Sequence, residues 1–513
     1  MKPIRLMAGF FTVGVWTMAS RVLGFVRDIL IVAFLGAGPV AEAFLIAFAL
    51  PNMFRRFFAE GAFNMAFVPM FSKKLEGHED PERFAQDAFS GLATVLIAFT
   101  VIALFAMPWL VLAMAGGFLG DDRFDLATSY GRIAFPYILF ISLAALLSGL
   151  LNATGRFAAA AAAPVLLNVL FIAAITAAVG LGWPLGDTLA WTVPIAGIAQ
   201  LALVWSAAAR AGFRLRFTRP RLSPDLRRLA VIAAPAALAG GVVQVNLLIG
   251  RQVASFFDGA IVWLSVADRL YQLPLGVVGI AVGVVLLPDL SRRLRAEDTA
   301  GGRYAFNRAA EISLALTVPA AVALVVIPVP LVGVLFQRGA FGSEDTLATA
   351  LALAIYGLGL PAFVLQKVLQ PLYFAREDTK TPFYFALAAM VVNAVAAIGL
   401  APVIGYVAAA VGTTLAAWAM VALLWHGSRR LGEAALIDDR FHHRIWRILL
   451  ASALMGFALW AAALAFAPYF APGALRYVAL ALLVTLGGTV YFAAAHLLGG
   501  LPLSDIRRSL RRG

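Results

Sequence analysis

Three absences narrow the functions that are open to this chain. It contains no cysteine, which excludes disulfide bonds and thiolate chemistry. Only 13% of its 513 residues are charged, whereas a soluble protein carries roughly 25%. No lysine follows a glycine, so the chain has no G-x-x-x-x-G-K-[ST] loop of the kind that cradles ATP phosphates.

Apolar runs take the place of the missing charge. The chain is 62% hydrophobic, and its mean hydropathy is +0.90. A membrane-spanning helix needs about 20 apolar residues, and the strict alternation of a membrane barrel is missing. We predict an all-α polytopic membrane protein with about fourteen transmembrane helices. The expected spans are 6–35, 39–71, 86–115, 126–151, 158–180, 187–208, 229–257, 261–289, 309–336, 346–373, 382–400, 403–426, 445–467 and 475–499. The first is too long for a signal peptide, so we expect it to be retained.

The positive charge is distributed as a topology signal. The net charge is +13, and most of the 40 lysines and arginines fall in alternate connections and at the two termini. The opposite set of loops holds Arg123, Arg338 and Arg476. The positive-inside rule therefore predicts a multi-pass protein of the cytoplasmic membrane with both termini in the cytoplasm. We expect membrane lipids as partners and no nucleic acid, and we expect Arg476, in an outer loop, to tolerate alanine.

The two halves of the chain look duplicated. "VPMFSKKL" (68–75) parallels "LPDLSRRL" (287–294). Similar offsets relate three further pairs: Pro136 with Pro361, Arg156 with Arg376, and Asn168 with Asn393. An offset of six spans keeps the orientation, so we predict two six-helix lobes related by a parallel repeat, plus two extra C-terminal helices. The predicted domains are an N-terminal lobe (1–208), a basic linker (209–228), a C-terminal lobe (229–430) and a C-terminal appendage (431–513).

Three predicted spans carry charged faces. In "SRVLGFVRD", Ser20, Arg21, Gly24, Arg27 and Asp28 fall within one helical arc of about 120°. "LPNMFRRFFAEGAF" (50–63) and "ADRLYQLP" (267–274) carry similar polar patches in two further spans. Intramembrane charges cost at least about 2.5 kcal/mol each, so they persist where they face a cavity or each other.

Two interpretations of these charges stay open. They are either internal ion pairs that clamp helices, such as Arg27 with Glu60, or a binding site for an anion. Because bases outnumber acids and the arginine fork matches phosphate, we favour the anion. We predict a substrate-binding set of Arg21, Arg27, Arg55, Arg56 and Arg269. The predicted supporting polar residues are Ser20, Asp28, Glu42, Asn52, Glu60, Asp268 and Gln272.

Enzyme chemistry has one weak signal. "DDRFD" (121–125) has the spacing with which polyprenyl-diphosphate enzymes bind magnesium, but it occurs once and contains Arg123. The five histidines show no metal-ligand spacing. We therefore predict no catalytic residue, no metal and no cofactor. Alanine at Asp121 separates the two readings, because it inactivates an enzyme and spares a transporter.

Several stretches resemble one family. "SRVLGFVRD", "GAGPVAEAF", "LPNMFRRFFAEGAFNMAFVPMF", "ADRLYQLPLGVVGIA" and "YFAREDTKTP" are similar to the MurJ (MviN) family of lipid II flippases, within the multidrug/oligosaccharidyl-lipid/polysaccharide exporter superfamily. The resemblance covers essentially the whole chain. It implies a central cationic cavity between two lobes, and a groove for a polyprenyl tail formed by the last two helices.

The resemblance also implies a substrate and a site. The substrate is lipid II, undecaprenyl-pyrophosphate bearing the disaccharide-pentapeptide, moved from the inner to the outer leaflet by a monomer. The alternative is a related exporter of drugs or of another polyprenyl-linked oligosaccharide. The family's important residues correspond to Ser20 with Arg21, Arg27 with Asp28, Arg55 and Arg269. The family commonly has aspartate where Glu42 stands, so a tight geometric role for that acid is not carried over. The sodium site of some members is not implied either, because span 229–257 has no acid.

Overall fold

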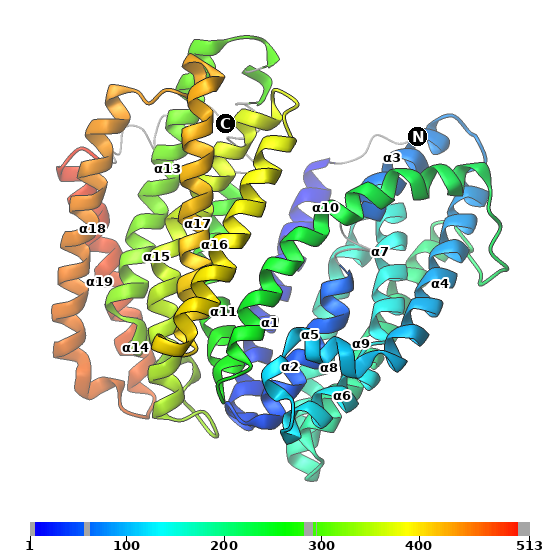
Figure 1. Ribbon diagram of the computed structural model, residues 1–513, viewed down its shortest axis with the longest axis horizontal. Coiled ribbons are helices and arrows are strands. Elements are labelled where there is room, and N and C mark those ends of the chain that lie inside the picture. The colour runs from blue at the N-terminus through cyan, green and yellow to red at the C-terminus, as the bar shows by residue number, and fades with distance from the viewer. Residues whose placement is uncertain (1–5, 56–61, 282–290, 294, 501–513) are drawn as a thin grey trace. The chain divides into compact units, whose positions relative to one another are not determined.

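The computed structural model describes residues 6–55, 62–281, 291–293 and 295–500 (Figure 1). The described chain is helical, apart from one isolated bridge between Arg338 and Phe341. It divides into two compact units, Met1–Val262 and Trp263–Gly513, each with its own internal contacts. The all-helical fold predicted from the sequence is confirmed.

Unit 1 is a bundle of helices. Within it α1 packs on α8, α8 and α7 pack on α9, and α2 packs on α6. Its elements are α1 (Leu6–Leu35), α2 (Pro39–Arg55), α3 (Ala62–Glu76), α4 (Pro81–Phe105), α5 (Met107–Met114), η2 (Gly116–Phe118), α6 (Asp122–Ala134), α7 (Tyr137–Ala153), α8 (Ala158–Leu181), α9 (Leu185–Arg210) and α10 (Pro224–Ala254).

Unit 2 repeats this kind of packing. Here α16 packs on α17, α17 and α13 pack on α15, and the hairpin of α18 and α19 packs on α13 and α14. Its elements are α11 (Ala260–Ala281, which begins just before the unit boundary), α13 (Thr299–Val326), α14 (Pro328–Phe336), α15 (Ser343–Phe374), α16 (Lys380–Ile404), α17 (Val407–Ser428), η4 (Arg429–Leu431), η5 (Glu433–Ala435), α18 (Asp439–Phe466), η6 (Ala467–Phe470) and α19 (Leu475–Leu497).

Within the described residues, ten helical stretches are long and apolar enough to cross a membrane. They are Pro81–Phe105, Asp122–Ala153, Ala158–Leu181, Leu185–Arg210, Thr299–Val326, Ser343–Phe374, Lys380–Ile404, Val407–Leu431, Glu433–Phe470 and Leu475–Leu497. The predicted spans outside this set are 6–35, 39–71, 229–257 and 261–289. Each of them carries intramembrane charge, and two of them overlap residues outside the described part of the chain. The exact count of fourteen stays a prediction.

Polar residues fix where several helices begin. Asp121, Ser223, Asp298 and Asp438 each precede a helix. Each side chain accepts a hydrogen bond from a backbone N–H two or three residues further on. These bonds satisfy donors that the first helical turn leaves without an internal partner. The sequence thereby marks the polar ends of otherwise apolar helices.

The motif "YFAREDTKTP" forms the turn between α15 and α16. Arg376 donates to the carbonyl oxygens of Leu372 (2.8 Å) and Leu431 (2.6 Å), so it ties this turn to η4. Asp378 accepts from the backbone N–H of Thr381 (3.0 Å), and this bond holds the pKa of its carboxyl below the usual range. The motif therefore stabilises the turn between two helices in this chain.

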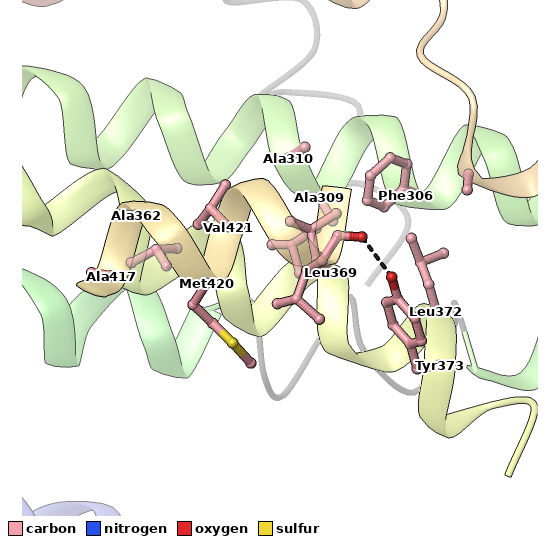
Figure 2. Close-up of a cluster of buried hydrophobic side chains, with 14 of the residues drawn as sticks. Phe306, Ala309, Ala310, Ala362, Leu369, Leu372, Tyr373, Ala417, Met420 and Val421 are labelled. Atoms are coloured by element: carbon pink, nitrogen blue, oxygen red, sulfur yellow. Dashed lines mark hydrogen bonds between the residues drawn. The ribbon is translucent and has the colours of Figure 1, made fainter. Parts of the chain in front are cut away.

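A cluster of small and large apolar side chains forms part of the core of unit 2 (Figure 2). Phe306 and Ala309 of α13 meet Leu369 and Tyr373 of α15 there, with Met420 of α17 beside them. The Tyr373 hydroxyl donates to the carbonyl oxygen of Leu424 (2.6 Å). Alanines let the helices approach closely, which is how helices associate in lipid.

Corresponding positions of the two units are alike. Asn168 in α8 and Asn393 in α16 are both buried. The stretches Asp122–Ala153 and Ser343–Phe374 each contain 32 residues and each include a proline. This likeness supports the parallel repeat, while the boundaries of the four predicted domains stay predictions.

Candidate functional site

The polar stripe of α1 is held by α8. Arg27 donates to Asp28 Oδ1 through Nε (2.9 Å) and Nη2 (2.7 Å), and to Asn168 Oδ1 through Nη1 (3.0 Å). The amide of Asn168 in turn donates to the backbone oxygen of Ser20 (2.9 Å). Arg21 is exposed on the same helix. Four of the predicted residues therefore lie on one helix, and Asn168 joins them although the sequence pattern gave it no role at the site.

Two aromatic rings flank the same guanidinium. The Cζ atom of Arg27 lies 5.7 Å from the ring centroid of Phe48 and 5.5 Å from that of Phe171. Such contacts contribute about 0.5–2 kcal/mol each, most where water is excluded. The side chain of Arg27 is only 12% exposed. It is thus fixed in position before any ligand arrives.

The second span is described only in part. Asn52 of α2 donates to the backbone oxygen of Phe48 (2.8 Å), so its side chain serves the helix. Arg55 is the last residue of α2 and is half-buried. Arg56 and Glu60 lie outside the described residues, and so does the suggested pair of Arg27 with Glu60.

The partner of Glu42 is not one of the arginines predicted to bind the substrate. Its side chain is 1% exposed and accepts from Arg123 Nη1 (2.9 Å) and from the backbone N–H of Ile261 (3.2 Å). Arg123 also pairs with Asp121 (2.6 Å) and Asp258 (3.0 Å). The sequence pattern assigns Arg123 to a loop and does not predict it as a partner of Glu42. The position of this arginine among the aspartates of "DDRFD" was the signal for an ion-pair cluster.

This arrangement accounts for the first acid of "DDRFD", Asp121. Asp121 caps α6 and binds Arg123. The guanidinium of Arg123 stacks on Phe118, with Cζ 4.5 Å from the ring centroid. Within the described ranges, no group of three His, Cys, Asp or Glu is arranged to hold a metal ion. The motif acts here as a helix start and an ion-pair cluster.

The third polar patch lies on α11. Gln272 donates to Asp268, and Asp268 and Arg269 are half-buried. On another face, Tyr271 stacks on Tyr356 of α15, with ring centroids 5.5 Å apart. One side of α11 is therefore packed within unit 2 while Gln272 is exposed. That the patches on α1, α2 and α11 face one cavity stays a prediction.

An apolar groove of about 550 Å³ runs along unit 2. Its walls come from α13, α15, α17 and α18, and its lining is almost wholly apolar. Lining residues include Leu314, Val318, Val322, Leu358, Pro361, Leu365, Trp418, Ile445 and Leu449. Its apolar lining suits a hydrocarbon chain.

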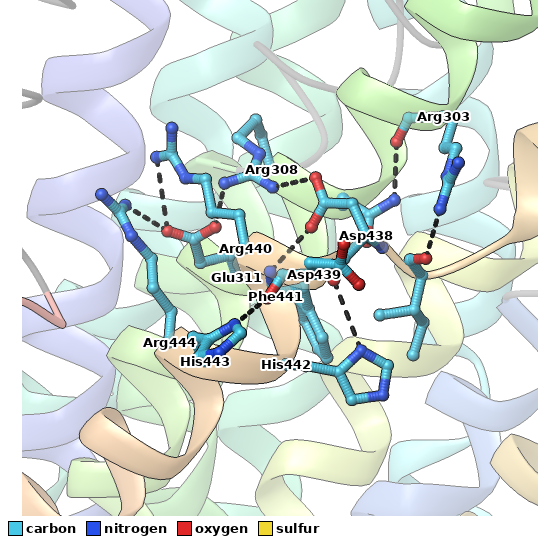
Figure 3. A network of polar contacts seen from close by, with 12 residues as sticks. Arg303, Arg308, Glu311, Asp438, Asp439, Arg440, Phe441, His442, His443 and Arg444 are labelled. Carbon is cyan, nitrogen blue, oxygen red and sulfur yellow. Dashed lines mark hydrogen bonds and ion pairs between the residues drawn. The ribbon is translucent and has the colours of Figure 1, made fainter.

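A charged network joins α13 to the start of α18 (Figure 3), and its Arg444 directly precedes the groove residue Ile445. Glu311 of α13 is buried and pairs with Arg308, Arg440 (3.5 Å) and Arg444. Arg308 also pairs with Asp438, which caps α18. The sequence overlooked Glu311, although it lies at the start of the predicted span 309–336. The pair of Arg308 with Glu311 is local, but Arg444 lies 133 positions after Glu311 and Asp438 lies 130 positions after Arg308, so no local spacing reveals the rest of the network.

The connection before α18 is also held to α13. Asn307 donates to the backbone oxygen of Leu436 (2.9 Å) and accepts from the N–H of Asp438 (3.0 Å). Arg303 donates to the oxygen of Ile437 (2.6 Å). The start of α18 is thereby fixed against the lobe that carries the groove.

The fold and the site define a class of protein. Helices that cross a membrane, charged faces confined to a few of them, and an apolar groove are features of a multi-pass membrane transporter. A solved structure described as the inward-facing conformation of a multidrug resistance MATE family transporter of the MOP superfamily shares the fold, with a TM-score of 0.66 at 14% identity, over 81% of this chain and 95% of that one.

The family within this class follows from closer likenesses. The family model "Lipid II flippase MurJ" matches residues 31–485. A protein of Rhizobium meliloti (strain 1021) described as "Probable lipid II flippase MurJ" is 45% identical over 99% of this chain and 97% of its own length. A solved "Lipid II flippase MurJ, inward closed conformation" has a TM-score of 0.79 at 25% identity, over 94% of this chain and 98% of that one. The chain belongs to the MurJ family of lipid II flippases.

Proposed function

We propose that this chain moves lipid II from the inner to the outer leaflet of the bacterial inner membrane by alternating access. Membership of the MurJ family supports this substrate. The observation that carries the proposal is the guanidinium of Arg27, which is held in a fixed position on the polar stripe of a mostly apolar helix. A pyrophosphate cannot cross hydrocarbon unpaired, and a preoriented arginine fork replaces part of its hydration.

The remaining predicted residues complete this site. Arg21, Arg55, Arg56 and Arg269 share the pyrophosphate, and the acids Asp28 and Asp268 orient the arginines and prevent binding that is too tight for release. The known pair of Arg27 with Asp28 supports that role. Phosphate oxygens would compete with Asp28 for the same donors, so binding and release exchange one anion for another.

The apolar groove serves the polyprenyl tail in this proposal. Its lining by Ile445 and Leu449 of α18 supports the role predicted for the C-terminal appendage, although α13, α15 and α17 supply most of the walls. The two six-helix lobes then move against each other around the head group. We also propose a monomer with both termini in the cytoplasm and no covalent step, since Asp121 is engaged with Arg123.

The test is complementation. A strain whose own flippase is depleted is supplied with this chain, and lipid II in the inner leaflet is measured. Growth with restored outer-leaflet lipid II supports the proposal. Failure to restore either, with the protein present in the membrane, contradicts it.

A further inference from the structure

Two arginines meet at one end of unit 2. Arg338 lies in the connection after α14 and Arg476 in the first turn of α19. Their Cζ atoms lie 6.0 Å and 5.1 Å from the ring centroid of Tyr477. Nη2 of Arg476 also donates to the Tyr477 hydroxyl (3.1 Å). Two cations thus share one aromatic ring.

Their contacts are carbonyl oxygens rather than carboxylates. Arg338 donates to the oxygens of Val334 (3.0 Å) and Leu335 (2.5 Å), and Arg476 donates to that of Gln337 (3.0 Å). In the described part of the chain, neither guanidinium is in ion-pair contact with an acid. Arg123, the third base of the predicted outer loops, has three carboxylate partners instead.

The surroundings add positive potential. Arg476 is only 8% exposed, and the Nε atoms of both arginines are buried without a hydrogen-bond partner. The first turn of α19 contains no acid, and its N-cap residue Ala474 offers no side-chain acceptor. The helix dipole therefore adds partial positive charge to two like charges. An anion is the group that this arrangement lacks.

The position on α19 indicates the source of that anion. Leu475, Val478 and Leu482 of the same helix are exposed and apolar, as expected for a surface in contact with lipid. Tyr477 is 46% exposed, and tyrosines gather at the level of the lipid head groups. The two arginines thus lie where the apolar surface of α19 begins.

We propose that Arg338 and Arg476 form a binding site for the phosphate group of a membrane lipid. The two forks supply charge-assisted donors, and Tyr477 holds them side by side. The site involves only unit 2 and none of the residues assigned to lipid II. It therefore stands whether or not the flippase proposal holds.

The test measures lipid binding to the purified full-length chain by native mass spectrometry. Dioleoylphosphatidylglycerol is the probe, and dioleoylglycerol, which has the same chains without phosphate, is the reference. We expect phosphatidylglycerol to bind more tightly, and the double variant Arg338→Gln/Arg476→Gln to weaken that binding about tenfold or more. The double variant Arg219→Gln/Arg221→Gln, which removes two exposed charges, is the matched control and should retain the tight site.

Four results decide the matter. Equal affinity of the site variant and wild type, or equal binding of the two lipids to wild type, overturns the proposal. Competition by soluble glycerol phosphate, lost in the site variant, assigns the same chemistry to phosphate from solution. Should the glutamine variant fail to fold, Arg338→Lys/Arg476→Lys keeps the charge without the fork, and undiminished phosphatidylglycerol binding by it overturns the bidentate site.

Discussion

At the scale of single residues, Arg27 shows how a charge is kept in lipid. An intramembrane arginine costs at least about 2.5 kcal/mol. Asp28, Asn168 and two aromatic rings offset that cost here. The same contacts restrict the side chain of Arg27 before a ligand binds. A ligand that displaces Asp28 therefore costs little further side-chain entropy.

Replacing Arg27 tests this role directly. We expect Arg27→Ala to abolish complementation and to weaken lipid II binding at least about tenfold, since a charge-assisted bidentate contact is lost. Arg27→Lys keeps the charge without the fork and should retain partial activity. Growth and purified-protein lipid II binding are measured at matched membrane expression. Wild-type values for Arg27→Ala would make Arg27 a structural clamp between α1 and α8.

Arg476 is unsuitable as the control for this experiment. Arg476 was expected to tolerate alanine as an outer-loop residue, but it is buried and bonded to Gln337 and Tyr477. That expectation came from loop position alone, which gives no information on tertiary contacts. Arg430 is exposed and lies in η4, directly after α17, so Arg430→Ala is the better control.

Glu42 and Arg123 should behave as a coupled pair. Glu42→Gln leaves a buried guanidinium with one partner fewer, and breaking a buried pair costs about 3–5 kcal/mol. We expect a lower Tm of the purified protein for Glu42→Gln and for Arg123→Gln, and a double variant that is less destabilised than the sum of the two. Glu42→Asp should lose less, because it keeps the charge. Additive effects in the cycle would show that the two side chains act independently.

At the scale of elements, the sequence predicted most helices and few of their contacts. Apolar runs predicted the spans because a segment in lipid must pair its backbone N–H and C=O groups within a helix and present an apolar surface. The partners of Arg27, Glu42 and Glu311 were missed, since Asn168, Arg123 and Arg444 lie far from them in the sequence. Periodicity places a residue on a face, but only the packed helices decide what that face meets.

The attachment of α18 is an element-scale prediction. Glu311 holds the first turns of α18 through Arg440 and Arg444, just before the groove residues Ile445 and Leu449. We expect Glu311→Gln to leave three arginines facing one another and to destabilise this attachment by about 3 kcal/mol. Hydrogen exchange of residues 439–450 should rise, while that of α8 stays unchanged.

The control for this variant is Glu433→Gln. Glu433 is an exposed acid in the same connection, and its replacement should leave exchange in α18 unchanged. If Glu311→Gln gives the same exchange as Glu433→Gln, the network does not hold α18 and apolar packing alone positions it. A rise across the whole chain would instead indicate global destabilisation.

At the scale of the whole molecule, charge determines orientation. The basic residues lie in alternate connections, and the positive-inside rule uses that asymmetry to predict which ends face the cytoplasm. The structure adds a reason for the exceptions. Arg123 is neutralised by carboxylates, so it exposes little net charge to oppose the rule. Arg338 and Arg476 lie instead where a lipid phosphate can neutralise them.

The predicted orientation can be tested because the chain has no cysteine. Arg123 is unsuitable as a labelling position, since it is 5% exposed. Ala340, in the exposed connection after α14, and Arg219, in the basic connection before α10, are accessible replacements. In intact cells we expect an impermeant thiol reagent to label Ala340→Cys and not Arg219→Cys, with Arg219→Cys labelled after permeabilisation. Both variants must support growth, which shows that the substitution has not reoriented the chain. Labelling of Arg219→Cys but not Ala340→Cys in intact cells would show that the chain has the opposite orientation. The site of Arg338 and Arg476 would then lie in the inner leaflet.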